Sequence, residues 1–342
     1  MPYSLSELGE RFADLIVETR NLSGEFSDIA AAGDCSSDSL LFVSEIKHLP
    51  DDLPAAIVTN QELSTQLPNE LAAIIVKDVR LAQALIKQHY DDYQAADVEW
   101  GMIHDSAVVH ESAQLGANVR IGPNSVIGAR VKIGDGSIVR SNCVIEHDAV
   151  VGENSVIHNL VNIGYGCTIG DRVIIRAGVM VGGEGFGFAP DAQGRYQRLP
   201  HTGSVIIGDD VQIGSNGNID RGTYGNTEIK RGVKLDALCH VAHNVLVDED
   251  TIMIAQSGLA GSCTIGKRVI LSGHTGVLDH KRVADDVTLV HRGGVTEDIT
   301  SAGMWAGTPA KPFKQYVRNL NPAKKIARLE QQLKRLLDER EG

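Results

Sequence analysis

The feature that most constrains the fold of this chain is an aliphatic residue at every sixth position. Between residues 103 and 295 the series holds 29 positions, in runs of 14, 3 and 12, and it breaks at residues 182–204 and near "TYGNT". An α-helix repeats about every 3.6 residues and a strand about every two, so neither explains the period. A solenoid of short strands does, because one aliphatic side chain per strand points inward and small or polar residues turn each corner. The positions are Ile103, Val109, Leu115, Ile121, Ile127, Ile133, Val139, Ile145, Val151, Ile157, Ile163, Ile169, Ile175, Val181, Ile207, Ile213, Ile219, Ile229, Leu235, Val241, Val247, Met253, Leu259, Ile265, Leu271, Val277, Val283, Leu289 and Val295.

Three such hexads close one triangular coil, so the series predicts a mainly β fold, a parallel β-helix of about ten coils. The period alone does not set the handedness of the helix. A purely structural rod is the alternative interpretation. A rod has little need of the two excursions that interrupt the coils, whereas loops on a rigid scaffold often carry function.

The flanks lack the six-residue period, which predicts three regions. Residues 1–100 are expected to form a small α/β domain, with a helix near Leu5–Glu18, strands in "SLLFVS", "AAIVTN" and "LAAIIVKD", and a helix near Val79–His89. Substrate recognition is its expected role, with oligomerisation as the alternative. The β-helix domain is then 101–305, with a loop insertion at 183–204, and 306–342 form a helical extension.

The extension is locally basic on an acidic protein. Pro309 and Pro312 mark the end of the coils, and from Lys324 onward the sequence is expected to be helical. An acidic partner is the first interpretation of the charge, and a solvated helix face that packs an oligomer is the alternative. Ile326, Leu329, Leu333 and Leu336 have the spacing of a short coiled-coil stripe. The nine cations are Lys311, Lys314, Arg318, Lys324, Lys325, Arg328, Lys334, Arg335 and Arg340, against four acids.

Composition excludes several classes of protein. The net charge of −12 argues against a general nucleic-acid binder. The five cysteines form no CxxC pair and are odd in number, so reduced thiols in the cytoplasm are expected. The start, "MPYSLSELGERFADLIVET", lacks the basic residues and apolar core of a secretory signal. No apolar run approaches the ~18 residues of a membrane span.

Two histidines in "LDALCHVAHNVLV" are candidates for chemistry. His243 lies two residues beyond the inward Val241, and adding one coil of 18 residues leads to Gly261, so the glycine backbone is predicted to stack against the histidine. A base beside an unobstructed N–H can accept a proton and stabilise an oxyanion. His280 lies a further 19 residues along, and Asp236 is available to orient a ring.

For His240 a surface role is favoured. A metal site is the weaker alternative for the pair, because three-residue spacing on an extended coil does not aim two rings at one point, as i, i+4 spacing does on a helix. An ordinary surface position also stays open for His243.

Four motifs resemble a known family. "GEGFGFAPD" (183–191), "IGSNGNIDRG" (213–222), "LD…HVAHNV" and "GLAGSCTIG" (258–266) look like those of UDP-3-O-(3-hydroxyacyl)glucosamine N-acyltransferase, a hexapeptide-repeat acyltransferase of lipid A biosynthesis. The resemblance covers nearly the whole chain. It implies a left-handed β-helix and a homotrimer, with active sites in the grooves between subunits.

The resemblance also implies an activity and its residues. A 3-hydroxyacyl chain passes from acyl carrier protein to the 2-amino group of a UDP-linked, O-acylated glucosamine. His243 matches the general base, Gly261 the oxyanion glycine and His280 a second active-site histidine. Acyl carrier protein is acidic, which suits the basic extension, and no cofactor is implied beyond the carrier's 4'-phosphopantetheine arm. Substrate-binding residues expected on this basis are Phe42, Glu45, His48, Phe186, Phe188 and Asp236.

The chain departs from the family's pattern at recognition positions. The family's uracil-binding "F-x-x-N-P-K-Y" reads "FVSEIKH" here, so Glu45 replaces the asparagine and His48 the tyrosine. Histidine can still stack, but an ionised glutamate cannot donate a hydrogen bond. "DRGTYGNT" differs from the usual "DRGALDDT", and Glu297 replaces an arginine expected to dock the carrier, for which Arg292 or the extension can substitute.

These departures keep three alternatives open. One is a paralogous N- or O-acyltransferase that acts on a different nucleotide-linked amino sugar. Another is a non-catalytic trimeric scaffold, against which the joint presence of His243, Gly261 and His280 argues. The third is an acetyl-CoA-dependent sugar acetyltransferase.

Overall fold

The computed structural model describes residues 2–50, 52–90, 98–290, 292–319 and 322–341, apart from the side chains of 323–325 and 336–341. The chain divides into two compact units, Met1–Asp97 and Val98–Gly342. No helix in the described ranges is long and apolar enough to cross a membrane.

The N-terminal unit is built on a five-stranded sheet in the order β2-β7-β6-β5-β4. Its strands are β2 (Ile16–Arg20), β4 (Asp28–Ala30), β5 (Ser39–Phe42), β6 (Ala56–Thr59) and β7 (Ala72–Val76), and β1 (Tyr3–Ser4) pairs with β3 (Glu25–Phe26). Helices α1 (Leu5–Arg11) and α3 (Val79–His89) add Leu5, Leu8 and Ile86 to its core. The remaining helical segments are η1 (Ala13–Leu15), η2 (Ile46–His48) and α2 (Gln61–Ser64).

The strands predicted in this unit are confirmed, and so is the helix Val79–His89. The predicted helix Leu5–Glu18 is wrong beyond Arg11, because residues 16–20 form β2 and pair antiparallel with β7. The β-branched Ile16, Val17 and Thr19 favour a strand, and the edge of β7 offers backbone partners that outweigh a short helix.

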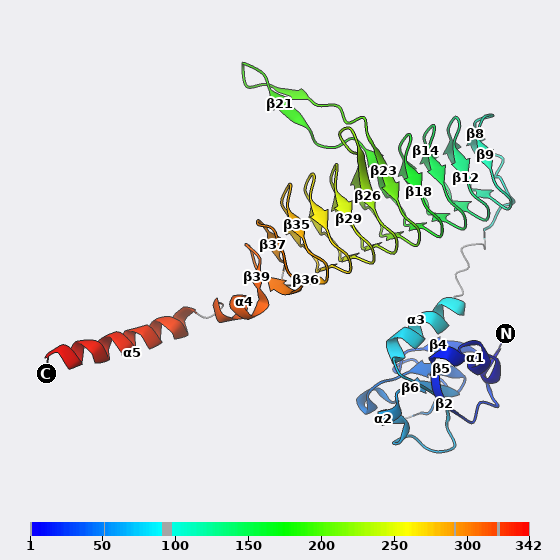
Figure 1. Ribbon diagram of the computed structural model, residues 1–342. Coiled ribbons are helices and arrows are strands. Elements are labelled where there is room, and N and C mark those ends of the chain that lie inside the picture. Colours follow the sequence, from blue (N-terminus) through cyan, green and yellow to red (C-terminus); the bar gives the residue numbers. More distant parts are fainter. Residues whose placement is uncertain (1, 51, 91–97, 291, 320–321, 342) are drawn as a thin grey trace. The chain divides into compact units, whose positions relative to one another are not determined.

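The second unit is a parallel β-helix whose successive strands enter three sheets in turn (Figure 1). Sheet 1 holds β10 (Arg120–Ile121), β13 (Ile138–Val139), β16 (Val156–Ile157), β19 (Ile174–Ile175), β24 (Gln212–Ile213), β27 (Lys234–Leu235), β30 (Ile252–Met253), β33 (Ile270–Leu271), β36 (Val287–Val290), β38 (Gly303–Ala306) and β39 (Lys311–Pro312). Sheet 2 holds β8 (Val108–Val109), β11 (Val126–Ile127), β14 (Val144–Ile145), β17 (Asn162–Ile163), β20 (Met180–Gly183), β25 (Asn218–Asp220), β28 (His240–Val241), β31 (Gly258–Leu259), β34 (Gly276–Val277) and β37 (Gly294–Val295). Sheet 3 holds β9 (Gln114–Leu115), β12 (Lys132–Ile133), β15 (Val150–Val151), β18 (Thr168–Ile169), β23 (Ser204–Ile207), β26 (Asn226–Ile229), β29 (Leu246–Val247), β32 (Thr264–Ile265) and β35 (Arg282–Val283).

Sheets of 11, 10 and 9 strands confirm the prediction of about ten coils. Of the 29 aliphatic positions predicted to point inward, all but Ile103, Val109 and Leu115 are buried. Those three lie in the first coil, which within the described residues of the second unit stacks on another coil on one side alone.

The corners repeat one backbone conformation every six residues. Positions such as Asn142, Asn244 and His280 have φ near +60°, in the left-handed region. Asparagine tolerates that region better than most residues because its side chain can hydrogen-bond locally. One corner per strand, each with a left-handed residue, therefore turns the chain from sheet to sheet.

Two features depart from the regular coil. The 183–204 excursion holds the hairpin β21 (Phe188–Pro190) and β22 (Tyr196–Arg198), which projects from the β-helix in Figure 1. After the last coil come α4 (Phe313–Asn319), which packs on β38, and α5 (Pro322–Glu341). Helix α5 agrees with the helix predicted from Lys324 onward, whereas α4 was not predicted.

Candidate functional site

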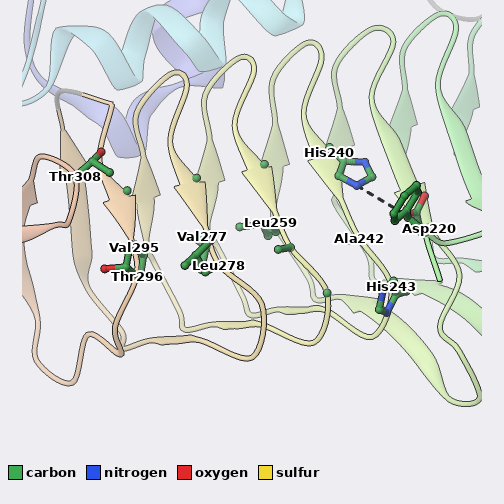
Figure 2. Close-up of a pocket in the computed structure, with 16 residues that line it drawn as sticks. Asp220, His240, Ala242, His243, Leu259, Val277, Leu278, Val295, Thr296 and Thr308 are labelled. Atoms are coloured by element: carbon green, nitrogen blue, oxygen red, sulfur yellow. Dashed lines mark ion pairs between the residues drawn. The ribbon is translucent and has the colours of Figure 1, made fainter. Parts of the chain in front are cut away.

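A groove of about 530 Å³ runs along the outer face of sheet 2. Figure 2 shows Asp220 and His240 at one end, Leu259, Val277 and Leu278 between, and Thr308 at the other. Its lining residues are Phe186, Asp220, His240, Ala242, His243, Gly258, Leu259, Ala260, Gly261, Gly276, Val277, Leu278, Gly294, Val295, Thr296 and Thr308. The groove is thus apolar along its length and carries titratable groups at one end.

A column of glycines makes the floor of this groove. His240, Gly258, Gly276 and Gly294 occupy paired positions on four successive strands of sheet 2. A Cβ on Gly258 or Gly276 would meet nothing within 4 Å, whereas one on Gly294 would lie 2.6 Å from Cγ2 of Thr308. Strands in a sheet are about 4.8 Å apart, so the column gives an open track of about 14 Å that Thr308 closes.

His243 stacks directly on Gly261. Ser262 N donates to His243 O at 2.9 Å, and His280 N donates to Gly261 O at 3.0 Å, so the three corners lie on consecutive coils. A Cβ placed on Gly261 would lie 2.6 Å from Cε1 and 2.8 Å from Nε2 of the His243 ring. Only glycine leaves room for the imidazole at this point.

The N–H of Gly261 is available to a ligand. At the same place in the hexad, Lys267 N donates to Asp285 Oδ1 at 2.9 Å and Glu153 N donates to Asp171 Oδ1 at 2.8 Å. Within the part of the chain that the structure describes, no protein group accepts from Gly261 N, and Asp279, one coil ahead, makes no such bond. His243 and Gly261 therefore place an imidazole and a free N–H side by side.

Asn244 fixes the ring of His243. Asn244 Oδ1 accepts from Thr223 N at 2.8 Å, and its Nδ2 donates to Thr223 Oγ1 at 3.0 Å. The same Nδ2 lies 3.0 Å from Nδ1 of His243. Since both ends of the amide are held, the imidazole plane is held as well.

Three more titratable groups surround His243, and the sequence interpretation missed two of them, Asp220 and His201. Asp220 is buried, accepts from Asn218 Nδ2 at 2.6 Å, and pairs with Nε2 of His240 at 3.7 Å. A surface role was favoured for His240, and the structure shows it exposed and lining the groove. His201 comes from the excursion, and its ring centroid lies 4.7 Å from that of His243.

Burial and charge together tune this cluster. Burial lowers the pKa of His243 below its usual value near 6.5, and His201 lowers it further, while Asp220 acts in the opposite direction. Burial raises the pKa of Asp220 against the effect of Asn218 and the histidines around it. At neutral pH the His243 imidazole is therefore mainly unprotonated and able to take up a proton.

Arg221 ties the excursion to the β-helix. Its buried guanidinium donates from Nε to Gly182 O at 2.8 Å and from Nη1 to Gly203 O at 3.0 Å. Nη2 donates to Tyr165 O at 3.2 Å, and the guanidinium carbon lies 3.6 Å from the centroid of the Tyr165 ring. One side chain thus holds both ends of the excursion.

The other residues proposed from the sequence for this region lie around the groove. His280 is an exposed corner residue one coil beyond Ser262, outside the lining. Phe186 lines the groove and contacts Phe188 edge to face, with centroids 4.9 Å apart. Asp236 lies at the end of a sheet 1 strand, where it accepts from Ala237 N and Ala255 N, so within this chain the carboxylate beside the histidines is Asp220.

The N-terminal unit carries Phe42, Glu45 and His48, spaced three residues apart. Phe42 ends β5, and η2 ends at His48. This is the carboxyl edge of a parallel strand, where α/β sheets commonly bind ligands. Glu45 pairs with Lys47 at 2.6 Å, and this hydrogen bond lowers the pKa of its carboxyl group.

Of the cations in the C-terminal extension, Lys311, Lys314, Arg318, Arg328, Lys334 and Arg335 have described side chains, and those of Lys324, Lys325 and Arg340 lie outside the described residues. Ile326, Leu329 and Leu333 are exposed, and the side chain of Leu336 is not described. In the described ranges no cluster of three or more His, Cys, Asp or Glu side chains could hold a metal ion.

Known proteins match this chain over nearly its whole length. It is 46% identical to the UDP-3-O-acylglucosamine N-acyltransferase of Methylococcus capsulatus, over 98% of this chain and 97% of that protein. It is 38% identical to the enzyme of that name from Helicobacter hepaticus, over 86% of this chain and 87% of that protein.

Two further likenesses concern the coils. Residues 101–185 match the GMPPB C-terminal domain. The solved structure of Arabidopsis UDP-N-acetylglucosamine acyltransferase superposes with a TM-score of 0.51 at 24% identity, covering 61% of this chain and 72% of that one. At this identity the likeness shows the fold alone.

Proposed function

Because this chain belongs to the family of UDP-3-O-acylglucosamine N-acyltransferases, we propose that it transfers a 3-hydroxyacyl chain to the 2-amino group of UDP-3-O-acylglucosamine in lipid A biosynthesis, with His243 as general base. One observation carries the proposal. An imidazole with a lowered pKa lies against the free N–H of Gly261, at the head of an apolar groove.

The chemistry follows from those two groups. The amine attacks the thioester carbonyl, a C–N bond forms, and the carbonyl oxygen becomes an oxyanion. Gly261 N donates to that oxyanion, and His243 takes the proton that the amine loses. When the tetrahedral intermediate collapses, the C–S bond breaks and the protonated His243 returns the proton to the departing thiolate. The chain therefore needs no covalent intermediate.

The glycine track is the proposed place for the acyl chain. Its floor has no side chains over Gly258 and Gly276, and Leu278, Val277 and Leu259 supply apolar surface beside it. Burial of each methylene contributes about 0.8 kcal/mol, so a chain laid along the track is held by its length. Phe186 closes part of the groove beside the base.

In the N-terminal unit, Phe42 and His48 are proposed to flank the uracil ring by stacking. Glu45 carries the charge that its Lys47 partner stabilises, so its carboxylate only accepts hydrogen bonds. The N3–H of uracil is a donor, which gives Glu45 a partner on the base. This residue replaces the family's asparagine without abolishing a hydrogen bond to the base.

The donor and the assembly complete the proposal. The acyl group arrives on the 4'-phosphopantetheine of acyl carrier protein, an acidic partner that suits the cations of the extension, and no other cofactor takes part. The working form is a homotrimer, in which Asp236 and His280 complete the site. The location is the cytoplasm, which the five unpaired cysteines favour, since thiols persist in reducing compartments.

Purified protein tests the proposal with UDP-3-O-acylglucosamine and a ladder of 3-hydroxyacyl carrier proteins, with products read by mass. One added acyl group on the acceptor is the expected result. Acylation only of a different nucleotide-linked amino sugar would identify the paralogous acyltransferase instead. Transfer from acyl-CoA in place of the carrier would contradict the assigned donor.

A further inference from the structure

We propose that His201 is a positioning residue, whose buried ring docks the 183–204 excursion onto His243 and so completes the wall of the site. The proposal rests on the proposed function for its meaning in catalysis. The docking itself is a property of the fold. Neither the six-residue repeat nor the four family motifs includes this residue.

His201 is enclosed by the excursion that carries it. Only 4% of its surface is exposed. Its Nδ1–H donates to Leu199 O at 3.0 Å, since a carbonyl only accepts, and its backbone N donates to Glu184 Oε1 at 3.3 Å. A Cβ on Gly185 would lie 2.8 Å from Nε2 and Cδ2 of the ring, and one on Gly187 would lie 2.6 Å from Cε1. Gly185 and Gly187 of "GEGFG" therefore form a cage shaped to an imidazole.

The cage is in turn packed against the base. The same Cβ on Gly185 would lie 3.0 Å from Cβ of His243, and the two rings are 4.7 Å apart. Arg221 holds the ends of the excursion at Gly182 and Gly203, but it does not touch the turn that meets His243. Thr202, beside His201, donates from its backbone N to Thr223 O of the β-helix at 3.0 Å, and the contact of His201 and Gly185 with His243 joins the turn itself to the base.

The contact with His201 also affects the pKa of His243, because titratable groups surround both rings. The groups facing the two rings are Asp220, His240 and His280 from the β-helix, with Glu184 and its partner Arg198 from the excursion. Among these groups, His201 is the largest electrostatic contributor to the lowered pKa of His243, after burial itself. Removing the ring exposes His243 to water and takes away the neighbour that most lowers its pKa, so both changes raise the pKa of the base.

The test uses the full-length protein as wild type, His201→Ala and His201→Asn. Asparagine can still donate to Leu199 O but does not fill the cage. His110→Asn is the matched control, because His110 lies on an early coil, exposed and bonded to Ser112. Two readouts need no substrate: the rate of trypsin cleavage after Arg195 and Arg198, and the titration of His243 followed by NMR of ¹³C-labelled histidine. The third is kcat/KM as a function of pH.

For His201→Ala we expect cleavage of the excursion to accelerate about 10-fold or more, and the His243 midpoint to move to higher pH. A loss of about 10- to 100-fold in kcat/KM should accompany these changes, the cost of a misplaced catalytic group. His201→Asn should fall between wild type and alanine, and His110→Asn should match wild type. If either the cleavage rate or the His243 midpoint stays unchanged in His201→Ala, the proposal is overturned. If His201→Ala shows both changes but the wild-type protein transfers no acyl group, the proposed function is refuted and the docking role stands.

Discussion

A Cβ on Gly261 would lie 2.6 Å from Cε1 of His243, so the imidazole occupies the space that any other residue at 261 would fill. Gly261→Ala should therefore displace the ring and cover the free N–H at once. Loss of one oxyanion donor costs about 10²–10³ in kcat, and we expect a fall in that range.

Gly101→Ala is the control for this glycine. It also lies in the second unit, and a Cβ there would meet nothing within 4 Å. Steady-state rates and thermal melting of both variants check the prediction. A Gly261→Ala protein that melts like wild type and turns over within a factor of about three of it would contradict the role of the N–H.

Asn244 should matter through the orientation of His243. Asn244→Gly keeps the left-handed backbone at φ 60° without strain and removes the side chain that lies against Nδ1 and bonds to Thr223. We expect kcat to fall about 10-fold with little change in KM, because the ring loses its support while the groove stays open. Asn118→Gly, at an equivalent corner with φ 58°, is the control and should behave as wild type. A change confined to KM would argue against the support of the ring.

The pH dependence follows from His243. A base works only when unprotonated, and burial together with His201 holds its pKa below the usual 6.5. The rate should therefore be constant near neutral pH and fall as the pH drops through a midpoint below 6.5. Because Asp220 raises the pKa of His243, Asp220→Asn should move that midpoint lower still. The profile of kcat/KM against pH tests this, and a midpoint above 6.5 would contradict it.

The glycine track predicts how acyl-chain length can be altered. Gly276→Leu would place a side chain into open space, so the fold should tolerate it while the track shortens. Thr308→Ala would remove the group that closes the track at Gly294. In competition between donors of different length, the first variant should favour shorter chains than wild type and the second longer ones. Equal loss of all donors in Gly276→Leu would show that the chain lies elsewhere.

Arg221 should stabilise the fold and the excursion together. Arg221→Lys keeps the charge but replaces a fork that serves three carbonyls with a single ammonium. Each buried acceptor left without a donor costs about 1–3 kcal/mol, so urea unfolding should show a loss in that range or larger. Trypsin cleavage in the hairpin should also accelerate. Unchanged stability would mean that other contacts suffice to hold Gly182 and Gly203.

The sequence predicted the coils well because every sixth residue carries the same physical requirement. Each inward aliphatic residue is buried for the same local reason, whatever the rest of the chain does. Because one coil holds 18 residues, adding 18 to His243 leads directly to Gly261. Asp220 and His201 could not be found in this way. Asp220 ends the irregular strand β25 and His201 lies in the excursion, so no fixed period relates either of them to His243. A histidine just before the coils resume, in "RLPHTGS", was the only sequence signal for His201.

The helix predicted over Leu5–Glu18 failed for a related reason. The apolar spacing of residues 5–15 suits a helix, but the strand beyond it forms because β7 offers an edge to pair with. That edge comes from residues about 60 positions away in sequence. A local sequence pattern does not predict pairing with a strand so distant in the chain. The β-branched residues 16, 17 and 19 were the only local feature that favoured a strand.

Replacement of His243 tests the central claim most directly. The rate of acyl transfer should be measured for His243→Ala and His243→Gln beside wild type, at a pH near 7 and with saturating acceptor and donor. General bases contribute about 10²–10⁴ in rate, so both variants should lose at least about 100-fold while their melting temperatures stay close to that of wild type. Transfer by a folded His243→Ala protein within a few-fold of the wild-type rate would contradict the assignment of His243 as the base.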